Sequence, residues 1–306
     1  MIDRSQLGPP IDVRGLFPRE RKALLDLLGG LAAGDWELAT VCPGWTVKDV
    51  TAHVLHDDLR RLASMRDGHQ GPRPEPGEPV AAFLDRVNQE WVAATRCLSS
   101  RQLVDLLTLS GGQIAALWRA LDPDAGGAAV SWAGLEVAPV WLDAARELSE
   151  YWTHQQQIRE ATGRPGLTDR QLLAPVLDTF LRALPYTLRD TGADPGTQVQ
   201  VTVSGDGQRP RPDAVGGHQG GHRMGPAPRR RRPSRGHGRA GRRHPLAALH
   251  PQRRSRGRRR PRAGPWGAPT RRAGPADRLH RLLTHAAYGW PAAARWSLTQ
   301  VPSRPR

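Results

Sequence analysis

Apolar residues recur every three or four positions through most of the chain up to residue 189, which is the spacing that lines one face of an α-helix. Helix-starting residues such as Pro18 and Thr46 open these segments, and glycine closes several of them. A later stretch instead alternates polar and apolar residues, as a β-strand does. The pattern predicts helices over residues 18–34, 46–66, 80–97, 99–121, 137–162 and 168–189, and a strand over residues 198–203.

These elements predict a mainly α-helical protein with a helical bundle over about residues 15–165. The helix and strand of residues 166–207 would begin a second, α/β domain. Gly111 and Gly112 predict a bend or a break in the fourth helix, because glycine weakens a helix interior. Asp58 lies inside the apolar arc of its helix, and nothing in the sequence explains a carboxylate there.

Charge divides the chain near residue 207. Residues 1–207 contain 20 Lys and Arg against 27 Asp and Glu, hence a net charge of −7. Residues 208–306 contain 25 Arg and two aspartates, hence a net charge of +23. The net charge of +16 for the whole chain therefore reflects this second part, the Arg-rich tail.

The Arg-rich tail lacks apolar periodicity and has few aliphatic residues, so we expect it to be disordered. One interpretation is a basic arm that binds nucleic acid or a membrane surface. We favour a second, in which residues 208–306 are an out-of-frame translation, because 43 Arg against only Lys22 and Lys48 indicate a GC-rich gene. Translating the other frames of the coding DNA past codon 207 separates the two.

Cys42 and Cys97 are too few for a disulfide-stapled secreted protein or for a cysteine-based metal site. The N-terminal residues contain no signal-peptide core, and no segment has the ~18 apolar residues of a membrane span. The sequence thus predicts a soluble, cytoplasmic protein without a membrane partner.

A candidate site begins in the helix over residues 137–162, where Glu150 and His154 lie four residues apart at the edge of the apolar arc. An imidazole and a carboxylate at this spacing can bind one cation, although the same spacing is common among solvated surface pairs. Zinc needs at least three protein ligands. A further ligand must therefore come from another helix.

His53 is the candidate for that ligand, because it lies in mid-helix on a polar flank that it shares with Asp57 and Arg60. The alternative is a histidine that packs on the seam of a bundle. We expect His56 to be its exposed neighbour, and His69 belongs to the Gly- and Pro-rich linker over residues 68–79.

Two runs carry a family resemblance: Pro43 to Leu55 (PGWTVKDVTAHVL) and Glu150 to Ile158 (EYWTHQQQI). Together they resemble the mycothiol-dependent maleylpyruvate isomerase family, a branch of the DinB-like four-helix metalloproteins, over roughly residues 15–205. The resemblance implies that His53, Glu150 and His154 are ligands of a divalent metal, usually zinc. Where the family usually has an aspartate after its second histidine, this chain has the glutamines of residues 155–157.

The resemblance further implies an enzyme in which mycothiol, as a thiolate, adds to a small electrophile. In the isomerases this means addition to an activated double bond, rotation and release, while other members resemble thiol transferases. A C-terminal α/β domain, similar to sterol-carrier folds, would complete the cleft. If residues 208–306 are out of frame, most of that domain is missing and activity would be impaired.

Two other functions stay open: a metal-binding bundle without catalytic activity, and a nucleic-acid-binding protein that acts through the Arg-rich tail. The chain has no P-loop glycine pattern, and Ser110 and Ser149 have no base partner at a spacing typical of a serine nucleophile. The sequence therefore identifies no catalytic residue.

Overall fold

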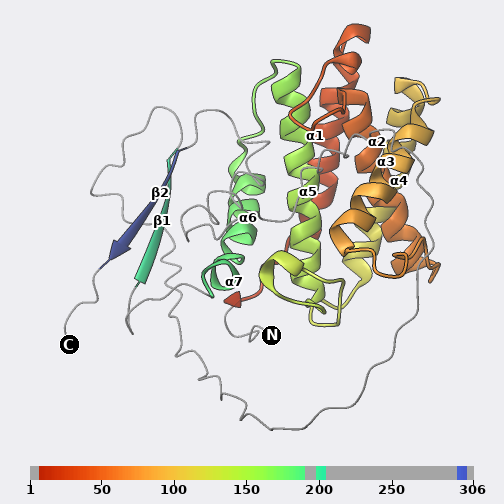
Figure 1. Ribbon diagram of the computed structural model, residues 1–306. Helices are drawn as coiled ribbons and strands as arrows, with labels where there is room; N and C mark the ends of the chain where they lie inside the picture. Colours follow the sequence, from red (N-terminus) through yellow and green to blue (C-terminus); the bar gives the residue numbers. More distant parts are fainter. Residues whose placement is uncertain (1–6, 190–197, 205–294, 302–306) are drawn as a thin grey trace, which may run out of the picture. The chain divides into compact units, whose positions relative to one another are not determined.

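The computed structural model of the protein describes residues 7–189, 198–204 and 295–301 (Figure 1). Its α-helices are α1 (Phe17–Gly29), α2 (Val47–Arg61), α3 (Val80–Thr95), α4 (Ser100–Ala120), α5 (Val140–Ala161), α6 (Arg170–Leu181) and α7 (Leu184–Leu188). Shorter helical turns are η2 (Arg14–Leu16), η3 (Ala33–Glu37), the π-helical η4 (Leu62–Arg66) and η5 (Ser131–Ala133). Strands β1 (Gln198–Ser204) and β2 (Arg295–Val301) pair antiparallel.

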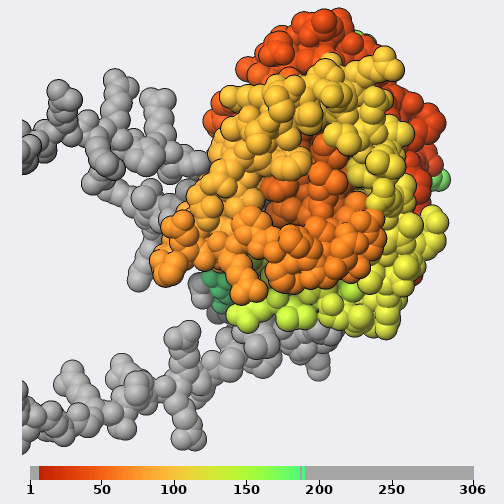
Figure 2. Space-filling model, turned by 90° about the vertical axis from the view of Figure 1, so that its right-hand side faces the viewer, coloured from red at the N-terminus to blue at the C-terminus, as the bar shows by residue number. Residues whose placement is uncertain are grey.

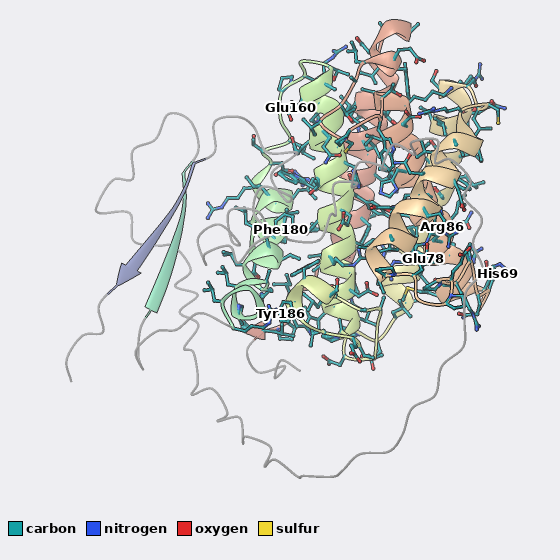
Figure 3. The ribbon with its side chains drawn as sticks, viewed as in Figure 1. His69, Glu78, Arg86, Glu160, Phe180 and Tyr186 are labelled. Atoms are coloured by element: carbon teal, nitrogen blue, oxygen red, sulfur yellow. The ribbon has the colours of Figure 1, made fainter. Side chains whose placement is uncertain are left out.

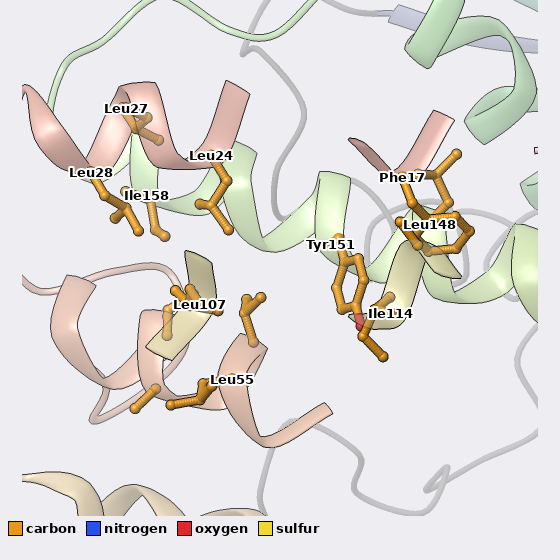
Figure 4. Packing of buried hydrophobic residues seen from close by; sticks show 14 of the residues in the cluster. Phe17, Leu24, Leu27, Leu28, Leu55, Leu107, Ile114, Leu148, Tyr151 and Ile158 are labelled. Carbon is orange, nitrogen blue, oxygen red and sulfur yellow. The ribbon is translucent and has the colours of Figure 1, made fainter. Parts of the chain in front are cut away.

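Helices α1, α2, α4 and α5 surround the main apolar core, which confirms the prediction of a mainly helical protein (Figures 1 and 4). Helix α3 packs against α2, and α6 packs against α5, where Leu172 and Val176 contact Trp152. The largest fully buried apolar side chains of the core are Leu24, Leu55, Leu103, Leu107, Ile114, Trp118, Leu148, Tyr151 and Ile158.

The start of α2 forms as its sequence predicts. Gly44 turns the chain at φ +79°, a conformation that glycine adopts without strain. The Thr46 hydroxyl then accepts a hydrogen bond from the Asp49 amide, and the Asp49 carboxylate accepts one from the Thr46 amide. Arg96, just after α3, pairs with the same carboxylate at 3.0 Å. This cap sets where α2 begins, and therefore the position of every side chain along the helix axis.

The predicted break at Gly111 and Gly112 is wrong, because α4 runs without interruption from Ser100 to Ala120. Gly111 serves packing instead of bending. A Cβ atom at this position would lie 2.6 Å from Cγ of Arg21, a buried side chain of α1 that crosses α4 there. Glycine therefore makes room for the arginine.

Asp58, which the sequence left unexplained, is the centre of a buried polar network. Arg21 of α1 holds its carboxylate through two hydrogen bonds of 2.6 and 2.9 Å. Ser110 of α4 and Tyr151 of α5 donate further bonds of 2.5 and 2.6 Å. The side chain of Asp58 is fully buried, and a buried charge needs such partners. One carboxylate thus joins all four helices of the bundle.

The predicted linker over residues 68–79 contains no helix or strand. It is tied to the next helix by an ion pair of 2.9 Å between Glu78 and Arg86 (Figure 3). His69 lies in this linker, as the sequence predicts, and is exposed.

The strand predicted over residues 198–203 is confirmed as β1. The helix predicted over residues 168–189 is divided into α6 and α7, and α6 packs against α5. The remaining residues of the predicted α/β domain, 190–197 and 205–207, lie outside the described residues, as does the Arg-rich tail except β2. The out-of-frame translation predicted for residues 208–306 falls on that tail. In the part of the chain that the structure describes, no helix is both long and apolar enough to cross a membrane.

Replacing Asp58 with alanine should strongly destabilise the protein, because Arg21 would stay buried without its counter-charge. We expect Asp58→Ala to lower the free energy of unfolding by about 3–5 kcal/mol in urea titrations. The matched control is Asp26→Ala, which removes an exposed carboxylate paired with Lys22 and should change stability by less than about 0.5 kcal/mol. Equal effects of the two substitutions would contradict this role of Asp58.

Candidate metal centre

Helices α2 and α5 run antiparallel and face each other through polar side chains. Near the end of α2, Arg61 pairs with Glu147 of α5 at 3.0 Å. Two turns earlier in α2, the rings of His53 and His154 meet edge to face with their centroids 4.7 Å apart. Residue numbers rise along α2 as they fall along α5, so the facing positions are His53 with His154, Asp57 with Glu150, and Arg61 with Glu147.

His53 is 8% exposed, and its ring lies near the side chains of Asp57 and Trp45. Its Nε2 atom is 3.6 Å from Oδ2 of Asp57, one helical turn later, and the ring of Trp45 lies 5.1 Å from its own ring. Its Nδ1 atom is buried and has no hydrogen-bond partner in the described part of the chain. Burial, aided by the positive charges of nearby groups, places the pKa of His53 well below its ordinary value. The ring is therefore neutral at physiological pH, as metal ligation requires.

His154 is held in one orientation by a hydrogen bond between its Nδ1 atom and Oε1 of Gln157, at 2.9 Å. An amide oxygen only accepts, so Nδ1 carries a proton and Nε2 is the nitrogen left for a metal. That Nε2 atom lies 3.9 Å from Oε2 of Glu150. A partner that fixes the far nitrogen of an imidazole is the usual support of a metal-ligating histidine.

Two carboxylates lie near the imidazoles, but the group of donor atoms that all lie within 4.8 Å of one another contains Asp57 and not Glu150. A donor atom of Asp57 lies within 4.8 Å of donor atoms of both His53 and His154. Glu150 lies next to His154 but is 36% exposed at its side chain, against 17% for Asp57. Burial raises the pKa of Asp57 well above its ordinary value, and repulsion from Glu147 and Glu150 raises it further.

The structure thus brings the two predicted histidines together and adds Asp57, which the sequence placed on the same flank without a role. Its spacing of four residues from His53 was the available signal. Two imidazoles and two carboxylates form a donor set that suits a divalent cation. The mutual repulsion of the carboxylates fits the same interpretation.

The three glutamines after His154 have separate roles. The amide of Gln155 donates to Glu20, a fully buried carboxyl whose pKa burial raises to about 7. Gln156 exchanges two hydrogen bonds with the backbone of Leu167. Only Gln157 faces the site, where its Oε1 atom accepts from His154 and from the thiol of Cys42, 3.2 Å away. Gln157 therefore supplies the acceptor that a following aspartate would supply.

His56 is not the exposed neighbour that the sequence predicted. It is 6% exposed and stacks on Trp91 of α3, with ring centroids 4.9 Å apart and planes within 7°. Burial lowers the pKa of His56 to about 4. Helix α3 covers this face of α2, and its position could not be read from local periodicity.

A pocket of about 350 Å³ opens on the other side of α2, between α2, η4 and α4 (Figure 2). Leu59 and Leu109 line it and are 39% and 64% exposed. None of the four donor residues of the candidate metal centre lines this pocket. It is therefore separate from the site.

Residues 17–159, which include all four donor residues, match the family model of the mycothiol maleylpyruvate isomerase N-terminal domain. Among solved structures, a crystal structure of the mycothiol-dependent maleylpyruvate isomerase matches with 16% sequence identity and a TM-score of 0.44, covering 60% of this chain and 72% of that chain. A structure of a histidine-to-alanine mutant of this isomerase matches with the same values. No curated protein sequence matches the chain.

Gln157→Leu should weaken zinc binding by about 10–100-fold, because His154 loses the acceptor that fixes its tautomer. Competition with a chromogenic chelator measures the dissociation constant. The matched control is Gln89→Leu, an exposed glutamine of α3, which should bind zinc like the wild type. Wild-type affinity in Gln157→Leu would show that Gln157 does not support the site.

Proposed function

We propose that the chain, whose residues 17–159 match the model of the mycothiol maleylpyruvate isomerase N-terminal domain, is a metal- and mycothiol-dependent enzyme of that family. Its metal ligands would include His53, Glu150 and His154, with zinc as the ion. Its substrate would be a small electrophile such as maleylpyruvate. The observation that carries the proposal is the contact between two buried imidazoles from antiparallel helices, with ring centroids 4.7 Å apart, inside the residues that match the family model.

The protonation of His53 and the orientation of His154 support the binding of a metal ion at the site. His53 is kept neutral by burial, and His154 presents Nε2 because its Nδ1 proton is held by Gln157. A bound divalent metal supplies Lewis acidity, which lowers the pKa of a coordinated thiol. Trp45 lies against His53 and shields that side of the ring from water. The chain thus supplies fixed ligands on rigid helices.

The expected reaction is an isomerisation without net change in atoms or oxidation state. The thiol sulfur forms a bond to one carbon of an activated double bond, and a proton is taken up at the neighbouring carbon or oxygen. Rotation follows about the resulting single bond. Loss of the same proton and of the thiolate then restores the double bond in the other configuration. A thiol transferase would stop after the addition.

The test uses the purified full chain and measures zinc content and thiol-dependent turnover of maleylpyruvate. We expect the wild-type chain to hold close to one equivalent of zinc. His154→Ala should lose this zinc, and its kcat/KM should fall at least about tenfold. His69→Ala, in the exposed linker, is the matched control and should keep both.

Two outcomes would contradict the proposal. Zinc below about half an equivalent, unchanged by His154→Ala, would remove the metal centre. Full zinc content without thiol-dependent turnover would instead identify a non-catalytic metal-binding bundle.

A further inference from the structure

Asp57 faces Glu150 across the antiparallel pair of helices α2 and α5, between the two histidines and the Arg61 ion pairs. From this placement we infer that Asp57 is a direct metal ligand, so that the site would hold its ion with two imidazoles and two carboxylates and would take the thiol as a fifth ligand. The inference rests on the proposed metal centre and extends its ligand set by one residue.

The distances around Asp57 suit coordination. Zinc bonds of about 2.0–2.1 Å in a tetrahedral arrangement place neighbouring donor atoms roughly 3.3 Å apart. Nε2 of His53 and Oδ2 of Asp57 are already 3.6 Å apart. Donor atoms of His53, Asp57 and His154 all lie within 4.8 Å of one another, so small rotations of the side chains would bring them onto one ion.

Asp57 also lacks the protein partners that its neighbours have. Arg61 is bound by Asp143 and Glu147, at 2.6 and 3.0 Å. Arg146 is bound by Glu147 at 2.6 Å and lies 3.8 Å from Glu150. In the described part of the chain, no residue donates a hydrogen bond to the carboxylate of Asp57, and its one ion-pair contact is with His53.

A carboxylate that is 17% exposed needs a donor or a cation nearby. A divalent ion among His53, Asp57, Glu150 and His154 would meet this need and would also offset the repulsion between the two facing carboxylates. Two carboxylates would balance the double charge of the ion. Their oxygen atoms would broaden the preference of the site from zinc toward harder ions such as Mn²⁺ and Fe²⁺.

The alternative is that Asp57 only orients His53 by accepting a hydrogen bond from Nε2–H, in which case His53 would bind metal through Nδ1. Removing Asp57 would weaken metal binding in both cases, so affinity alone does not separate them. A cysteine at position 57 does, because only a thiolate bound directly to Co²⁺ gives an intense sulfur-to-metal charge-transfer absorption in the near ultraviolet.

The experiment therefore uses the full chain with Cys42→Ser, which removes the thiol nearest the site, and Co²⁺ as the probe. Asp57→Cys should show the charge-transfer band on adding Co²⁺. The matched control, Asp105→Cys in the exposed face of α4, should not. Asp57→Asn, which keeps the shape of the side chain, should weaken Co²⁺ binding at least about tenfold with an unchanged circular dichroism spectrum.

Each outcome decides the inference. A folded Asp57→Cys protein that binds Co²⁺ without the band, or Asp57→Asn with wild-type affinity, would overturn Asp57 as a ligand. If His154→Ala still loses the ion, the proposed metal centre stands without Asp57. A parent protein that binds no Co²⁺ would overturn the metal centre and the inference together.

Discussion

The buried carboxylate of Asp58 decides how the bundle can pack, because an unpaired charge in that position would cost several kcal/mol. Arg21, Ser110 and Tyr151 reach it from three other helices, and Gly111 leaves the space through which Arg21 passes. Arg61, one turn later, adds its pairs with Asp143 and Glu147. Together these contacts fix the rotation of α2 about its own axis and its position along α5.

The candidate metal centre follows from that register. His53 and Asp57 occupy the flank of α2 that faces α5 once Asp58 is turned into the bundle, and the Thr46 cap sets their height along the helix. His154 is fixed from its own helix through Gln157. The site is thus a consequence of buried ion pairs that lie outside it, which gives its imidazoles little freedom to reorganise when a ligand arrives.

Local sequence patterns were sufficient for helices α1 to α5 and for the cap at Thr46, since both depend on residues within a few positions of one another, whereas the single helix predicted over residues 168–189 is divided into α6 and α7. Other features depended on contacts that no local pattern contains. The partners of Asp58 lie 37, 52 and 93 residues away, and the interruption expected at Gly111 was wrong because a side chain of α1 fills the missing volume. His56 was misjudged for the same reason, since Trp91 covers it from α3.

For the site, the sequence and its family resemblance pointed to His53, Glu150 and His154, while Asp57 stayed unassigned because a carboxylate four residues from a histidine is common on helix surfaces. X-ray absorption of the zinc-loaded full chain tests the central claim most directly. The account predicts two imidazoles and carboxylate oxygens at about 2.0–2.2 Å, with one imidazole lost in His53→Ala, and a sulfur at about 2.3 Å after mycothiol is added. A zinc shell without histidine, or one unchanged in His53→Ala, would contradict it.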